Sequence, residues 1–204
     1  MSDFVWASRK NNKNGDDFDS NSDPNDNDIV REAANHIYFY SEVKRARILD
    51  LNKTLRKLEK QFVNRSNTLD TMYPDIHLHI QSFGGSVFAG FSTIGYIKNS
   101  QIPVHTIIEG CAASAATLIS VTAPKRSIYA NSYMLIHQLS SGLWGKYEEM
   151  KDDMKNCDRL MDMIRDIYLE HTNITKKKLD GILKHDLWFD AEECLAYGLV
   201  DEII

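Results

Sequence analysis

One serine, Ser114, lies in a run of small residues at positions 110–116 (GCAASAA). The run follows an apolar, β-branched segment at positions 104–108, which predicts a strand that turns sharply into a helix. The first N–H groups of a helix have no helical partner, and they carry the positive end of its dipole. A serine at such a turn can act as a nucleophile beside donors for an oxyanion. Taken alone, however, the run is more typical of a small-residue helix packed in a core.

Catalysis by a nucleophilic serine also needs a base, an orienting acid and oxyanion donors, and the chain offers candidates for all of them. His137 ends an expected strand and precedes a flexible loop, where it can point into a cleft. Asp186 lies in a charged step before an aromatic pair, and Gly84-Gly85 stand between an expected strand and helix. Considered separately, each has a simpler explanation. His137 can be a strand-end histidine with local hydrogen bonds, and Asp186 a solvated turn acid or a helix cap. Gly84-Gly85 can form a tight turn or a phosphate cradle.

The elements that must position these residues alternate along the chain. Apolar alternation predicts strands, and apolar residues at helical spacing predict helices. The expected strands cover residues 36–40, 76–80, 104–108, 126–129 and 133–136. The expected helices cover residues 43–63, a segment ending near 97, a segment from 114, and 146–171, with a polar loop at 64–74. An Asp190–Glu193 capping box and Gly198 frame a last short helix. This order predicts an α/β fold with a largely parallel sheet.

The longest expected helix has an unusually broad apolar face. One stripe and its wider flank consist of Met150, Met154, Cys157, Met161, Ile164 and Tyr168, with Leu160, Met163 and Ile167. A face of this width predicts burial against both the helix's own domain and a neighbouring subunit.

The N-terminal segment differs in composition from the rest of the chain. Residues 11–28 contain six asparagines and six aspartates with one aromatic residue, Phe18. Such a segment cannot bury enough apolar surface to offset the entropy of ordering. We therefore predict a disordered tail over residues 1–30, either a removable propeptide or a flexible gate, and one folded domain over residues 31–204.

Composition restricts the partners and the compartment. The net charge of −5 and the isoelectric point near 5.8 argue against a nucleic-acid partner. No apolar run approaches the ~18–20 residues that span a bilayer, and the N-terminus lacks a signal-peptide core, so no membrane is expected. The cysteines, Cys111, Cys157 and Cys194, are odd in number and widely spaced among apolar neighbours. They are expected to be buried free thiols in a reducing compartment, which predicts a cytoplasmic protein.

Four motifs occur in order at residues 81–85 (QSFGG), 110–116 (GCAASAA), 134–138 (MLIHQ) and 196–203 (AYGLVDEI). With these motifs and their spacing, residues 37–204 resemble the ClpP family, the proteolytic subunit of the Clp protease. The resemblance implies a crotonase-like fold of repeated ββα units with a protruding handle helix. It also implies a serine endopeptidase that hydrolyses peptides or unfolded proteins through an acyl-enzyme, with no metal or organic cofactor.

The resemblance assigns roles to individual residues. Ser114 matches the nucleophile, His137 the general base and then acid, and Asp186 the acid that fixes the imidazole tautomer. The backbone amides of Gly85 and Ala115 match the oxyanion donors. The residues expected to hold an extended substrate strand are Gly84, Ser86 and Gln138. The family further implies a homo-oligomer of two stacked heptameric rings, a tetradecamer, and an ATP-driven unfoldase as partner.

The chain also departs from the family pattern. The tail replaces the usual N-terminal hairpin, and His77 and His79 replace tyrosines of the unfoldase-docking face. We expect these to be surface histidines rather than metal ligands, and docking to be weakened or altered. Lys184-His185 replaces an Asp-Arg pair whose arginine pairs across the ring interface, which makes pH-sensitive stacking a hypothesis. Ala115 stands where methionine is common, and Leu139 where proline is usual.

Three alternatives remain at this point: a phage-type head-maturation peptidase on the same fold, a non-catalytic ring subunit, and a crotonase-type acyl-CoA enzyme. The last does not require the serine and the histidine to occur together. Cleavage specificity and the identity of any unfoldase are not readable from the sequence.

Overall fold

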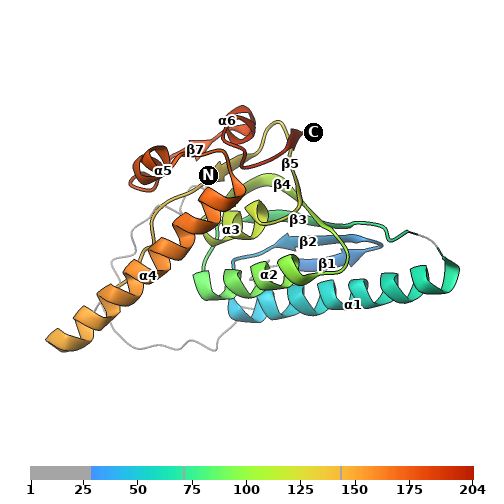
Figure 1. Ribbon diagram of the computed structural model, residues 1–204, viewed down its shortest axis with the longest axis horizontal. Helices are drawn as coiled ribbons and strands as arrows, with labels where there is room; N and C mark the ends of the chain where they lie inside the picture. Colours follow the sequence, from blue (N-terminus) through green and yellow to red (C-terminus); the bar gives the residue numbers. More distant parts are fainter. Residues whose placement is uncertain (1–28, 71, 143) are drawn as a thin grey trace.

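The computed structural model of the protein describes residues 29–70, 72–142 and 144–204 (Figure 1). Residues 1–28, which make up most of the predicted tail, lie outside the described residues. The first described element is a strand at residues 29–33 that the sequence patterns did not predict, and its first two residues fall within the predicted tail.

Eight strands of the described chain form one mixed sheet, in the order β1-β2-β3-β4-β5-β8, with β6 paired to β4 and β7 to β6. They are β1 (Ile29–Ala33), β2 (His36–Tyr40), β3 (Ile76–Ser82), β4 (Val104–Ala113), β5 (Lys125–Ile128), β6 (Tyr133–Leu135), β7 (Trp188–Phe189) and β8 (Glu202–Ile203). The β1–β2 and β6–β7 pairs are antiparallel, and the others are parallel. The predicted α/β fold with a largely parallel sheet is confirmed.

The central strand β4 is longer than predicted. The expected strand ended at Ile108, but the structure continues it through Gly110 to Ala113. Gly110 has a φ of 72°, a left-handed conformation that favours glycine, and its N–H donates to Ser132 Oγ at 2.8 Å. The first part of β4 pairs with β5 and the last part with β6. Four of the seven residues of the small-residue run are therefore strand, and the turn comes only at Ser114.

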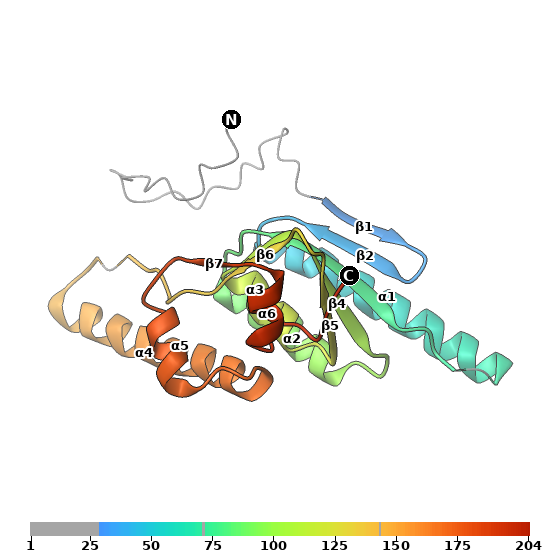
Figure 2. The same ribbon diagram turned by 90° about the horizontal axis from the view of Figure 1, so that it is seen from above.

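The helices lie mainly on one face of the sheet (Figure 2). They are α1 (Arg45–Leu69), α2 (Val87–Asn99), α3 (Ala115–Val121), α4 (Tyr147–His171), α5 (Lys176–Ile182) and α6 (Ala191–Ala196). Helix α1 packs through apolar residues at helical spacing: Leu51, Leu55 and Leu58 are buried and belong to the same core as Ile37 and Phe39 of β2. No helix of the described residues is long and apolar enough to cross a membrane.

One predicted helix boundary needs correction, and one predicted helix start is confirmed. Helix α1 runs to Leu69, so the polar loop expected from residue 64 is wrong over residues 64–69. The helix ends at Asp70, whose φ of 50° is a left-handed cap, and Thr68 Oγ1 donates to the carbonyl of Asn64 within the last turn. The Asp190–Glu193 capping box is present at the start of α6.

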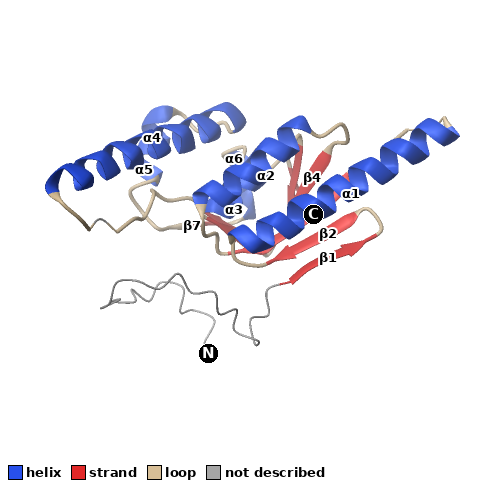
Figure 3. Ribbon diagram, turned by 90° about the horizontal axis from the view of Figure 1, so that it is seen from below, coloured by secondary structure: helices blue, strands red, loops and turns tan. Residues whose placement is uncertain are grey.

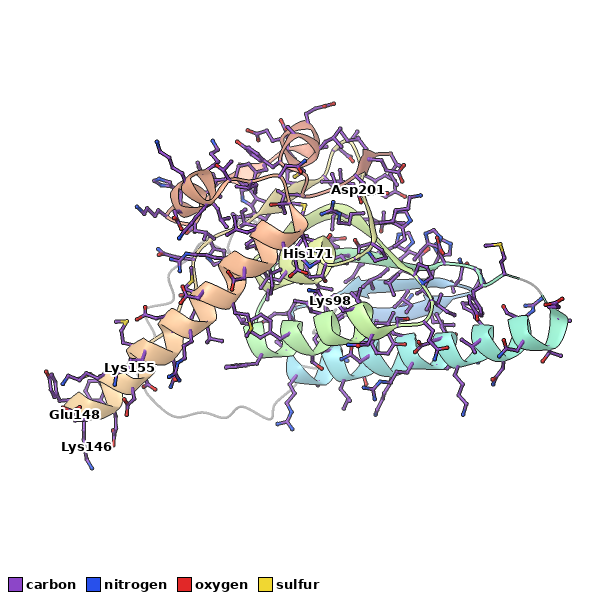
Figure 4. The ribbon with its side chains drawn as sticks, viewed as in Figure 1. Lys98, Lys146, Glu148, Lys155, His171 and Asp201 are labelled. Atoms are coloured by element: carbon purple, nitrogen blue, oxygen red, sulfur yellow. The ribbon has the colours of Figure 1, made fainter. Side chains whose placement is uncertain are left out.

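Helix α4 protrudes from the body of the molecule (Figures 1 and 3). Its C-terminal half is buried at Ile164, Ile167 and Tyr168, whereas Met154 and Met163 are about half exposed. Figure 4 shows Lys146, Glu148 and Lys155 at the protruding end and His171 against the body. The apolar stripe was predicted to be buried against its own domain and a neighbouring subunit. Within this chain, it is buried only in the C-terminal half of α4.

The sheet face opposite the helices carries a cluster of histidines from three adjacent strands. His36, His77 and His105 are aligned across β2, β3 and β4, and His79 lies two residues further along β3. His79 bonds to His36 at 2.7 Å and to Glu109 at 2.7 Å, and it is only 6 % exposed. The expectation of a surface histidine at position 79 is therefore wrong, because side chains of the neighbouring strands cover it. Within the described residues, no three His, Cys, Asp or Glu side chains converge as a metal site.

The three cysteines are free thiols, but they are not equally buried. Cys194 is buried, and Cys111 and Cys157 are partly exposed, so the prediction of three buried thiols is wrong for two of them. Burial raises the pKa of the Cys111 thiol to about 11 and that of Cys194 to about 12. Both thiols therefore stay protonated near neutral pH.

Candidate active site

The carboxyl ends of three parallel strands meet at one edge of the sheet. Ser114 follows β4 directly, His137 lies two residues after β6, and Gly84-Gly85 follow β3. Parallel open sheets place their ligand sites beyond the carboxyl ends of the strands. The topology thus gathers the predicted serine, histidine and glycines at the edge where a substrate is expected.

Ser114 occupies a strained turn between β4 and α3. Its φ of 55° and ψ of −127° are rare for a residue with a side chain, and such geometry persists only where the surroundings hold it. The Ser114 N–H donates to the carbonyl of Leu135 at 2.9 Å, which ties the turn to β6. The Ser114 carbonyl accepts the backbone N–H of Thr117 at 3.0 Å and its hydroxyl at 2.6 Å. The turn leaves the serine side chain partly exposed at the start of α3.

Strand register brings His137 and Asp186 together. In the antiparallel β6–β7 ladder Leu135 pairs with Trp188, and two residues further along the same register sets His137 opposite Asp186. The Nδ1 atom of His137 lies 3.8 Å from Oδ1 of Asp186, which is within ion-pair range but longer than a hydrogen bond. The His137 side chain is 21 % exposed and that of Asp186 is 66 % exposed. Water therefore screens this carboxylate in the single chain.

Ser114 and His137 line one cavity of about 290 Å³. Gly85 and Ala115, the predicted oxyanion donors, line it as well, and so do the predicted strand-binding residues Ser86 and Gln138. Apolar side chains of α3 and α4 complete the lining: Leu118, Leu160, Ile164 and Tyr168. Asp186 is not part of the lining and stands behind His137. Among the residues that the structure describes, Ser114 Oγ forms no hydrogen bond with His137.

The glycine pair packs closely against the serine turn. A Cβ on Gly84, whose φ is 91°, would lie 2.6 Å from the carbonyl oxygen of Ala113 and 2.6 Å from Cβ of Ser114. Gly85, with a φ of 141°, would place a Cβ 2.7 Å from the carbonyl oxygen of Val43. Both positions need glycine because of backbone conformation and because of the close approach. The pair can thus bring its backbone next to a group bound at Ser114.

The segment predicted to hold a substrate strand is already paired in part. Val43 N–H donates to the Gly84 carbonyl at 2.7 Å, and Ser86 N–H donates to the Val43 carbonyl at 2.8 Å. The Gln138 N–H donates to the carbonyl of Leu183 at 2.9 Å. An added strand would have to use the other backbone groups of these segments or displace these bonds.

Two residues near the site were not singled out for function by the sequence patterns. Tyr168 OH lies 2.7 Å from Thr117 Oγ1, directly behind the Ser114 turn. Thr117 is fully buried and Tyr168 is 1 % exposed. The sequence places Tyr168 on the apolar stripe of α4, but the pairing of α4 with α3 is a tertiary contact that the stripe does not specify. The sequence does carry one signal for this contact: a tyrosine within a stripe of methionines and aliphatic residues, because a buried phenol hydroxyl needs a hydrogen-bond partner.

Comparison with known proteins agrees with this arrangement. A family model described as Clp protease matches residues 31–204. The chain is 30 % identical over 170 residues to a protein of Deinococcus radiodurans named ATP-dependent Clp protease proteolytic subunit, covering 81 % of this chain and 83 % of that protein. It is 33 % identical over 157 residues to the ATP-dependent Clp protease proteolytic subunit 2 of Treponema denticola, covering 76 % and 78 % respectively.

Proposed function

Because the chain belongs to the Clp protease family, we propose that it is a serine-type endopeptidase with Ser114 as its nucleophile. The observation that carries the proposal is the convergence of Ser114 and His137 on one cavity, with Asp186 opposite His137. The proposed substrates are peptides or unfolded proteins, since a chain must be extended to lie along a strand edge. The proposed chemistry uses no metal and no organic cofactor.

In the proposed reaction, Ser114 Oγ attacks the scissile carbonyl carbon while His137 takes the hydroxyl proton. The resulting tetrahedral oxyanion is bound by the amides of Gly85 and Ala115. Collapse breaks the C–N bond, His137 passes its proton to the leaving amine, and the acyl group remains as an ester on Ser114. Water, deprotonated by His137, then hydrolyses the ester, releases the carboxylate product and restores the serine.

Two contacts must tighten for this reaction. The Ser114–His137 hydrogen bond has to form, and the 3.8 Å separation between His137 and Asp186 has to shorten to hydrogen-bond distance. Catalytic hydrogen bonds are often long without substrate and contract in the bound complex. We propose that substrate binding and burial of Asp186 in the assembled protein draw these groups together.

The proposed assembly is a pair of stacked heptameric rings that use α4 at the ring–ring contact. Its support is the exposed apolar surface along α4, which includes Tyr147, Met154 and Met163. An ATP-driven unfoldase is the proposed partner, because both relatives are named as parts of an ATP-dependent protease. We propose altered docking, since His79 of the expected docking face is bonded to His36 and Glu109 and does not project freely.

The test is hydrolysis of a fluorogenic peptide and of unfolded casein by the assembled protein. Ser114→Ala should abolish both activities, whereas Ser92→Ala, which loses a hydrogen bond from Asn52 between α1 and α2 and lies outside the cavity, should leave both unchanged. Activity that survives in Ser114→Ala contradicts the assignment of the nucleophile. A correctly assembled wild type without any activity favours a non-catalytic ring subunit. Cleavage limited to one scaffold-type substrate, with no effect of an unfoldase, favours a head-maturation peptidase.

A further inference from the structure

The strained backbone of Ser114 is held from behind by a chain of two hydroxyl groups. Thr117 Oγ1 donates to the Ser114 carbonyl at 2.6 Å, and Tyr168 OH lies 2.7 Å from the same Thr117 oxygen. Thr117 belongs to α3, and Tyr168 belongs to α4, 51 residues further along the chain. The two hydroxyls therefore link the nucleophile turn to a different helix.

The direction of the hydrogen bonds follows from counting protons. Thr117 has one hydroxyl proton, and the Ser114 carbonyl, which can only accept, takes it. Tyr168 must therefore donate its proton to a lone pair of Thr117 Oγ1. Burial raises the pKa of Tyr168 far above its usual range, so the phenol remains a donor at any working pH. Consecutive hydroxyl donors strengthen one another in a dry interior.

The surroundings make this chain of hydroxyls difficult to replace. Thr117 is 0 % exposed and Tyr168 is 1 % exposed, so water does not substitute for either hydroxyl. Ser114 adopts φ 55° and ψ −127°, and its carbonyl has two donors, both from Thr117. A carbonyl that loses its hydroxyl donor is held by the Thr117 N–H alone, so it is less firmly fixed, and any rotation toward an ordinary turn would move Cα and Oγ of Ser114 with it.

We propose that Tyr168 is a positioning residue: through Thr117 it holds the Ser114 carbonyl and so keeps the serine hydroxyl aimed at the substrate carbonyl. The inference rests on the proposed function, because it assigns Tyr168 a part in the same reaction. Tyr168 itself does not touch the reacting atoms. Its effect should thus appear in the rate of attack rather than in substrate affinity.

The test compares Tyr168→Phe, which removes only the hydroxyl, with Tyr96→Phe as a matched control. Tyr96 also loses one hydroxyl hydrogen bond, to Glu59 at 2.6 Å, but between α1 and α2 and away from the cavity. We expect Tyr168→Phe to lower kcat about fivefold to tenfold with KM within about twofold, as one hydrogen bond predicts. Its rate of modification by a fluorophosphonate should fall by the same factor, while Tyr96→Phe should retain both rates.

Substitutions at Thr117 keep the inference falsifiable if Tyr168→Phe is poorly folded. Thr117→Val should lower kcat at least as much as Tyr168→Phe does. Thr117→Ser, which keeps the hydroxyl, should have a kcat within about threefold of the wild-type value. The double variant Tyr168→Phe/Thr117→Val should be no slower than Thr117→Val alone, because both changes interrupt one chain of bonds.

The outcomes separate this inference from the proposed function. The positioning role alone is overturned if the wild type is labelled and both Tyr168→Phe and Thr117→Val keep the wild-type kcat and labelling rate. Equal slowing by Tyr96→Phe, or full additivity in the double variant, also overturns it, because either result reflects general loss of stability. Wild-type protein that is neither active nor labelled overturns the proposed function and this inference with it.

Discussion

His137 and Asp186 stand opposite each other in the extended register of β6 and β7, with 3.8 Å between Nδ1 and Oδ1. A ladder of only two residue pairs, Met134–Phe189 and Leu135–Trp188, therefore sets the relation between the proposed base and its acid. The other half of the site depends on β4, whose last residue Ala113 pairs with Leu135. The geometry of the proposed site thus follows from the pairing of β6 with both neighbours.

Asp186→Asn should reduce kcat by about 10–100-fold and leave KM nearly unchanged. A fully buried triad aspartate contributes up to about 10⁴-fold, but this carboxylate is 66 % exposed and beyond hydrogen-bond distance in the single chain. Steady-state hydrolysis of a fluorogenic peptide, at one pH and with matched oligomer content, measures the change. Wild-type kcat in Asp186→Asn would remove this residue from the mechanism.

Gly84→Ala should destabilise the protein and abolish activity, whereas Gly95→Ala should be neutral or slightly stabilising. A Cβ at Gly84 would lie 2.6 Å from two atoms of the serine turn, but a Cβ at Gly95 meets nothing within 4 Å. Alanine within a helix is favoured over glycine by ~0.5–1 kcal/mol. Urea unfolding and peptide hydrolysis of both variants test this contrast, and a stable, active Gly84→Ala would contradict the close packing described above.

The histidine cluster should make the protein less stable as the pH falls from about 6.5 to 4. Burial lowers the pKa of His105 to about 4, and burial also lowers those of His36 and His77. The unfolded chain, with an ordinary value near ~6.5, binds protons in this window that the folded chain does not, so acidification favours unfolding. The His105 shift alone corresponds to a loss on the order of 2 kcal/mol by about pH 5.

Urea unfolding at pH 7.5, 6.0 and 5.0 measures this slope. The groups that face the cluster are Tyr38, Tyr40 and Glu109, with Lys125, Asp75 and Glu202 at the far side. His105→Asn should flatten the dependence of the unfolding free energy on pH. Asp201→Asn should not, because the lowered pKa of Asp201 changes stability only below pH ~3.8, outside the measured range. A wild-type stability that is constant from pH 7.5 to 5.0 would contradict the account of the cluster.

Ring stacking should depend on pH through His185. Family resemblance places an arginine at this position in a contact between rings, and a histidine carries the same charge only when its ring is protonated. Sedimentation velocity should show more of the stacked form at pH 6 than at pH 8, and His185→Arg should show the stacked form at both. The same oligomer for wild type at pH 6 and pH 8 would dispose of the hypothesis.

The sequence predicted the parts of the fold whose signal is local. The stripe of Leu51, Leu55 and Leu58, the capping box at Asp190 and the strand before the serine turn each depend on neighbours within a few residues. The motif spacing also identified the family. These features were readable because periodicity and capping are properties of a short segment.

The remaining features depend on contacts across the sheet. Strand β7 has two residues and no periodicity, and it exists because β6 lies beside it. His77 and His79 are expected to be surface histidines, but His36 and Glu109 of the neighbouring strands bury His79. The Tyr168–Thr117 bond joins helices whose packing no local pattern specifies. A single sequence does not state which strands or helices are neighbours.

The central claim is that Ser114 is an activated nucleophile, and covalent labelling by diisopropyl fluorophosphate tests it most directly. The assembled wild type should gain one adduct per chain, located on Ser114 by peptide mass spectrometry. Ser114→Ala should gain none, and His137→Ala should react at least about 100-fold more slowly, since the base activates the serine. An assembled wild type that takes up no label, or an adduct that persists in Ser114→Ala, would contradict the account.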